Sequence, residues 1–148
     1  MSLIDSNLSV ASKPAVTCNE AGKVLAVRAA AAAPASLAAD DVFLMAKLPA
    51  GYVITGGYLA ATDLDTHATT PTITLTVGLM DLSDTTLDAN TDLLTVSTVG
   101  QDGSMAAFTK GLTQGPFAVD KFVAVKVVAA AATKAAGTVY CQVEYAQP

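Results

Sequence analysis

The stretch TITLTVGL at Thr72–Leu79 decides the fold class. Its four aliphatic side chains, Ile73, Leu75, Val77 and Leu79, occupy every second position, and threonine or glycine lies between them. Successive side chains of a β-strand point to opposite faces, so a period of two places these four on one buried face. The stretch is therefore predicted to be a half-buried strand.

The same alternation and the same preference for β-branched residues recur along the chain. The other segments that we expect to be strands are 23–30, 41–48, 52–61, 105–108, 122–128 and 138–145. The alanine runs at 29–33 and 129–132 are too short for stable helices and are interpreted as strand ends or turns. Because the last two strands are joined by the short segment 129–137, they are expected to form an antiparallel hairpin. The prediction is an all-β, antiparallel β-sandwich of about eight strands, a jelly roll.

Two segments depart from this rhythm. Residues 81–99 are rich in Asp, Asn and Thr, and Leu93, Leu94 and Val96 are expected to form a short helix capped by Asn90 or Thr91. Residues 1–22 alternate only weakly and are interpreted as an N-terminal arm or first edge segment, with the sandwich domain at residues 23–148. The apolar residues of an arm are ordered only where they dock on a neighbour. The residues expected to make such contacts, with another subunit, are Leu3, Ile4, Leu8 and Val10.

Composition excludes several classes of function. The chain is 52% hydrophobic and 14% charged, with a net charge of −5, so it lacks the basic clusters with which proteins bind nucleic acid. No stretch approaches the roughly 20 apolar residues that span a bilayer, and no secretory signal begins the sequence. A high fraction of apolar residues with few charged ones is typical of chains that bury part of their apolar surface between subunits. An oligomer without membrane or nucleic-acid partners is therefore expected.

Residues able to carry chemistry are few. A metal site built from Asp63, Asp65 and His67 is the weaker alternative to a polar turn. An acidic set at 81, 84, 88 and 92 is expected to be a solvated loop rather than a calcium site or an acid–base pair. Cys18 and Cys141 are expected to be reduced, with a disulfide as the alternative. No catalytic or phosphate-binding motif occurs, so neither enzyme activity nor a cofactor is expected.

Several motifs resemble those of small structural proteins encoded in the head gene clusters of tailed phages. They are KLPAG at 47–51, DLDT at 63–66, PTITLTVGLMD at 71–81, STVGQ at 97–101, VKV at 125–127 and AGTV at 136–139. Together they cover about Lys23 to Tyr145. The resemblance implies a capsid decoration, or cement, protein with a jelly-roll fold. Such a protein is typically a homotrimer that binds the major capsid protein on the outside of a head assembled in the host cytoplasm.

Two other functions remain open. One is a tail-associated module that binds a receptor or carbohydrate, for which Tyr58 and Tyr140 are the candidate aromatic residues, although packing between strands is the simpler role of tyrosines in strands. The other is a small enzyme or metal protein, which the sparse motifs disfavour.

Overall fold

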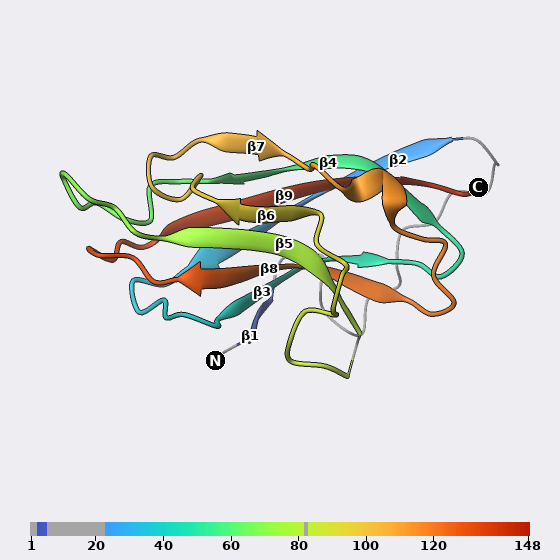
Figure 1. Cartoon of the computed structure of the whole chain (residues 1–148), viewed down its shortest axis with the longest axis horizontal. Helices are drawn as coiled ribbons and strands as arrows, with labels where there is room; N and C mark the ends of the chain where they lie inside the picture. The colour runs from blue at the N-terminus through green and yellow to red at the C-terminus, as the bar shows by residue number, and fades with distance from the viewer. Residues whose placement is uncertain (1–2, 6–22, 82) are drawn as a thin grey trace.

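A computed structural model describes residues 3–5, 23–81 and 83–148 of the chain. Within these ranges nine strands form two stacked sheets (Figure 1). A single 3₁₀ turn, η1 (Gly111–Thr113), is the only helical element of the described residues. The strands are β1 (Leu3–Asp5), β2 (Val24–Ala33), β3 (Val42–Leu48), β4 (Val53–Ala61), β5 (Thr74–Asp81), β6 (Leu94–Ser97), β7 (Met105–Ala107), β8 (Lys121–Ala129) and β9 (Gly137–Ala146). No helix in the described ranges has the length and apolar character needed to cross a membrane.

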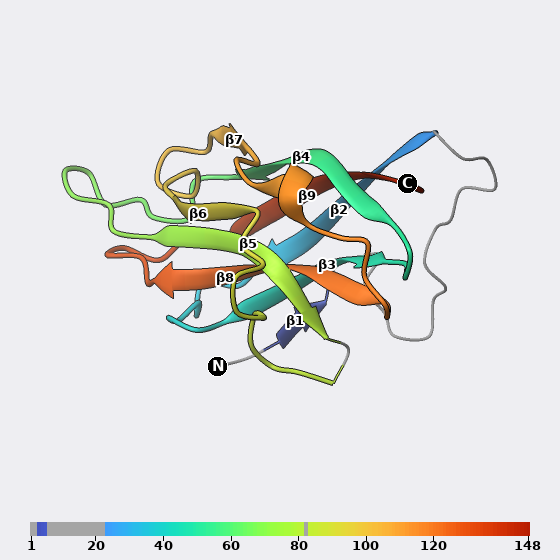
Figure 2. The same ribbon diagram turned by 45° about the vertical axis from the view of Figure 1, so that its right-hand side comes forward.

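The order of the strands is that of a jelly roll. One sheet has the order β1-β3-β8-β5-β6 and the other the order β2-β9-β4-β7, so the chain changes sheet at almost every step from β2 to β9. All neighbours are antiparallel except β1, which pairs in parallel with β3 and extends the first sheet at its edge (Figure 2). The predicted all-β jelly-roll sandwich is confirmed.

The main core lies between the two sheets. The four alternating residues that decided the fold class are completely buried in it, together with Val123, Val125 and Val127 of β8. β9 supplies Val139, Cys141, Val143 and Tyr145 from the opposite sheet. Period-two alternation thus identified the inner faces of these three strands correctly, although β5, which was expected to be half-buried, is buried on both faces.

The expected hairpin between the last two strands is wrong. β8 lies between β3 and β5, whereas β9 lies between β2 and β4. Both hydrogen-bonding edges of each strand are therefore taken by other partners, and the two strands face each other across the core. The segment 130–136 crosses from one sheet to the other.

The helix expected within 81–99 is also wrong. Leu94–Ser97 is strand β6, paired with β5, and the backbone N–H of Leu93 donates to the carbonyl of Val77 at 2.8 Å. Four residues cannot sustain a helix, while the open edge of β5 offers them backbone partners. The Thr91 hydroxyl bonds to the backbone of Leu79 rather than capping a helix.

The loop that follows β5 covers part of a second hydrophobic cluster on the outer face of the five-stranded sheet. Its buried members are Val42, Leu44, Met80, Phe122 and Ala124. Leu87 of the loop packs on them, and a side chain at Gly78 would approach the Leu87 methyl group to 3.1 Å. Glycine in the middle of β5 therefore leaves room for the loop to lie on the sheet.

Candidate functional site

One end of the sandwich is closed by a buried carboxylate. Asp65 lies in the β4–β5 loop and is 1% exposed. Its Oδ2 accepts backbone N–H bonds from Thr72 at 2.6 Å, Ile73 at 3.2 Å and Ala132 at 2.9 Å. Its Oδ1 accepts a further one from Thr133 at 2.8 Å. The carboxylate thereby joins the β4–β5 loop to the crossing segment 130–136, two regions far apart in the sequence.

The charge state of Asp65 follows from these bonds. Burial on its own would raise the pKa of the carboxyl group, since it penalises the charged form. The four backbone donors outweigh that penalty and hold the pKa well below its usual range. Asp65 is therefore an anion whose lone pairs are already used by the backbone.

Asp63 and His67 organise the same turn. Asp63 Oδ1 accepts the N–H of Asp65 at 3.1 Å, and His67 Nδ1 accepts the N–H of Thr70 at 3.0 Å. A metal ion held by these side chains would have to compete with the backbone donors on Asp65. The geometry therefore favours the polar-turn interpretation over the metal alternative.

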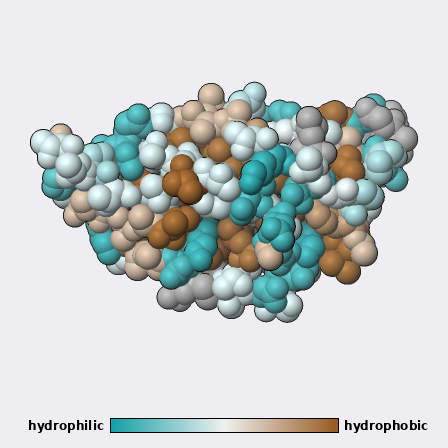
Figure 3. All heavy atoms as spheres, in the orientation of Figure 1, coloured by the Kyte–Doolittle hydropathy of each residue, from teal (hydrophilic) through white to brown (hydrophobic). Residues whose placement is uncertain are grey.

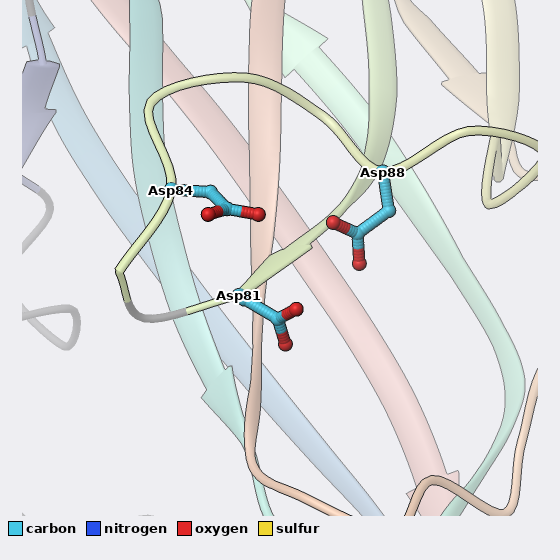
Figure 4. Close-up of side chains that lie close together, drawn as sticks. All are labelled: Asp81, Asp84 and Asp88. Atoms are coloured by element: carbon cyan, nitrogen blue, oxygen red, sulfur yellow. The ribbon is translucent and has the colours of Figure 1, made fainter.

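Three of the four acidic residues at 81–92 do come together, although no helix brings them there. Carboxylate oxygens of Asp81, Asp84 and Asp88 lie within 4.8 Å of one another, at the end of β5 and in the loop after it (Figure 4). Asp92 does not belong to this group. The Lys121 ammonium lies 2.7 Å from Asp81 Oδ1 and 2.7 Å from Asp88 Oδ2.

Lys121 is the cation of this cluster. Its hydrogen bonds to Asp81 and then to Asp88 raise the pKa of the ammonium group, and they outweigh the opposing effect of burial. A lysine of β8 thus pairs with two of the three carboxylates of the cluster. The cluster holds the loop against the sheet, consistent with the packing of Leu87.

The four tyrosines separate into two pairs. Tyr52 and Tyr145 are buried and pack edge to face, with ring centroids 5.5 Å apart. Tyr58 and Tyr140 lie on the outer face of the four-stranded sheet, where Tyr58 is 41% exposed. Packing between strands explains the first pair and leaves the second with surface available to a partner.

Tyr58 and Tyr140 line a hollow of about 240 Å³ on that outer face, which we call the Arg28 hollow. Its lining residues are Arg28, Tyr58, Ala60, Met105, Tyr140 and Gln142. The strand register explains the grouping, because Arg28, Gln142 and Tyr58 form one row across the sheet and Tyr140, Ala60 and Met105 form the next. The Arg28 guanidinium lies 4.9 Å from the centroid of the Tyr140 ring.

Sequence reasoning did not single out Arg28. The signal available in the sequence was its position. On the outward-facing side of the predicted strand 23–30, Arg28 lies between two alanines and is the sole charged residue. Apolar side chains are also exposed over this sheet, with Val24 56% and Met105 66% exposed. By contrast, the side of the molecule seen in Figure 1 is a mosaic of small hydrophilic and hydrophobic patches (Figure 3).

The four N-terminal residues expected to contact a partner are only partly described. Leu3 and Ile4 lie in β1, and Ile4 packs half-buried against the main core of its own chain. Leu8 and Val10 lie outside the described residues, so their role in contacts stays a prediction. Cys18 lies outside them as well, whereas Cys141 is a free thiol whose burial raises its pKa to about 12.

Comparison with solved structures identifies the family. A chain in the capsid of Ralstonia phage GP4 matches this chain with a TM-score of 0.87 and 31% sequence identity, over 99% of this chain and 98% of that one. The protein belongs to this family of phage capsid proteins. A chain in the capsid asymmetric unit of cyanophage Pam1 is 33% identical to this capsid protein, with a TM-score of 0.73 over 96% of this chain and 97% of that one.

A third match shows the fold alone. A chain in the acid-stable capsid of Helicobacter pylori bacteriophage KHP30 is 18% identical, with a TM-score of 0.53 over 85% of this capsid protein and 93% of that chain. Comparisons with protein-family models and with curated proteins find no match. The prediction of a phage capsid protein, and so of a virion component, is thus confirmed.

We predict that Asp65→Asn destabilises this capsid protein by about 2–4 kcal/mol at pH 7, because an amide nitrogen cannot accept the N–H bonds that one carboxylate oxygen now receives. The pKa of Asp65 is lowered in the folded state, so its stabilisation is complete above the unfolded pKa near 4 and declines as pH falls toward the folded value. Guanidinium unfolding from pH 7 to pH 3 measures both effects. The exposed Asp102→Asn is the control. Equal stability of the two variants at pH 7 would show that Asp65 does not join the loops.

A second pair of variants tests the acidic cluster. Lys121→Gln should cost about 1–3 kcal/mol, because it leaves three adjacent carboxylates without their cation. Lys47→Gln removes a lysine whose one ion pair among the described residues is with Asp120, at 3.1 Å, and this substitution should cost less stability. Urea unfolding measures the stability that each variant loses. Raising the salt concentration should reduce the difference between the losses of Lys121→Gln and Lys47→Gln, since salt screens the repulsion among the three carboxylates. Equal losses of stability at low salt would contradict this role of Lys121.

Proposed function

We propose that the protein decorates the phage head, where homotrimers bind the lattice of the major capsid protein from outside and stabilise it. The observation that carries the proposal is the match to a phage capsid chain over nearly the full length of both chains. A protein in this role works without catalysis or a cofactor. Its function is the burial of surface against its neighbours.

The charge of the chain favours the outer side of the shell. Packaged DNA is a dense array of phosphates, and a protein with a net charge of −5 is repelled by it. The exterior surface carries no such penalty. Assembly on the head inside the host cytoplasm is the matching expectation for localisation.

Stabilisation by such a protein is additive. Burial of apolar surface contributes about 25 cal/mol per Å² before the costs of association are subtracted, so one small contact is weak. A trimer that contacts several capsid subunits at once converts later contacts into intramolecular ones and binds far more strongly. The exposed apolar side chains of the four-stranded sheet and the N-terminal residues Leu3, Ile4, Leu8 and Val10 are the proposed contact surfaces.

Binding to isolated heads tests the proposal. The purified protein should have three times its 14.9 kDa chain mass by light scattering. It should co-sediment saturably with phage heads that lack it, and it should raise the temperature at which those heads release DNA. Failure to co-sediment with heads and absence from purified virions would overturn the proposal.

A variant addresses the N-terminal residues within the same experiment. Leu8→Ser combined with Val10→Ser leaves the sequence of β1 intact and should weaken co-sedimentation if this segment contacts the capsid. The matched control is Thr17→Ser, which changes the same segment without removing an aliphatic side chain. Equal binding of the double variant and the control would show that Leu8 and Val10 do not contact the capsid.

A further inference from the structure

Arg28 stands out on the outer face of the four-stranded sheet. It is the only arginine of the sequence, and it projects from β2, an edge strand of that sheet. Its guanidinium lies over the Tyr140 ring, 4.9 Å from the centroid. Stacking on an aromatic face holds the planar group in one orientation, so less conformational entropy is lost when it forms hydrogen bonds.

The Arg28 guanidinium has no acidic partner in the part of the chain that the structure describes, because no carboxylate there forms an ion pair with it. Glu144, the acidic residue of β9 on the same face, is positioned instead by Gln142, whose Nε2 donates to Glu144 Oε1 at 3.2 Å. An oriented arginine without an acidic partner presents a fork of N–H groups that matches a carboxylate in geometry and charge.

The rim of the Arg28 hollow suits a protein partner. Tyr58 is 41% exposed and Met105 66% exposed, so both offer apolar surface around the charged group. Tyr, Met and Arg are enriched in protein interfaces, and Tyr and Arg dominate their binding energy when water is excluded around them. A volume of about 240 Å³ is sufficient for one or two side chains.

We propose that the Arg28 hollow receives an Asp or Glu side chain, flanked by apolar residues, from a loop of the major capsid protein. Arg28 would bind the carboxylate through two N–H groups, while Tyr58 and Met105 cover the neighbouring side chains and exclude water. This inference rests on the proposed decoration function and adds to it a binding face and the chemistry of the partner.

A sugar is the less suitable occupant. Carbohydrate rings stack on free aromatic faces, and the Tyr140 ring is already covered on one face by Arg28. Tyr58 alone remains as a platform. The positive charge of the hollow adds nothing to the binding of a neutral sugar, but it matches a carboxylate.

The test is the binding of variants to phage heads that lack the protein. Arg28→Gln removes the charge and should weaken binding at least tenfold relative to wild type, and Arg28→Lys should restore only part of the loss because an ammonium cannot form the fork. Lys134→Gln, which removes an exposed charge in the crossing segment, is the matched control and should bind as wild type does. Unchanged thermal unfolding of all three variants shows that folding is intact.

Each other outcome is decisive. If wild type does not bind heads, the decoration function itself fails. If wild type binds and Arg28→Gln binds equally well, only the Arg28 hollow is excluded. If Arg28→Gln changes the oligomeric state of the protein, while those trimers of the variant that do form bind heads as wild type does, the hollow is assigned to contacts between copies of this chain. Binding of wild type to a glycan array, lost in Tyr58→Ala, would assign it to a carbohydrate.

Discussion

The inner faces of the two sheets are apolar and are buried against each other, and the rest of the structure depends on that contact. Leu75 and Val77 of β5 face residues such as Val143 of β9 across the core, and all three are completely buried. Because the chain changes sheet at almost every step, most loops pass over an end of the sandwich. The backbone groups of those loops then lie beside a dry core and need partners.

Charged side chains hold loops in place at two positions, in different ways. Asp65 accepts backbone N–H groups from two of the loops that cross one end, and it is kept ionised by them despite its burial. On the outer face of the five-stranded sheet, Lys121 binds Asp81 and Asp88 and so holds a loop that covers apolar residues. Asp65 and Lys121 both have their partners within the chain. Arg28 differs from them because no carboxylate of the described residues pairs with it, and it therefore points to a partner outside the chain.

Alternation predicted seven of the nine strands of the described residues because it reports which side chains avoid water. It carries no information on which strand lies alongside, so it cannot distinguish a hairpin after β8 from the observed crossing between the sheets. The helix expected at Leu93–Val96 failed for a related reason: local preference in so short a run yields to the backbone partners offered by β5. The Arg28 hollow depends on the register of four strands, which no single segment reveals. The resemblance carried by strand-and-turn motifs led to the correct class, a phage capsid protein, although each motif on its own is compatible with many β-sandwiches.

A cryo-electron microscopy reconstruction of the intact virion tests the central claim most directly. We expect the jelly roll in groups of three on the outer surface of the head, each in contact with several major capsid subunits. Density for this chain in the tail, or on the DNA-facing side of the shell, would contradict a decorating role.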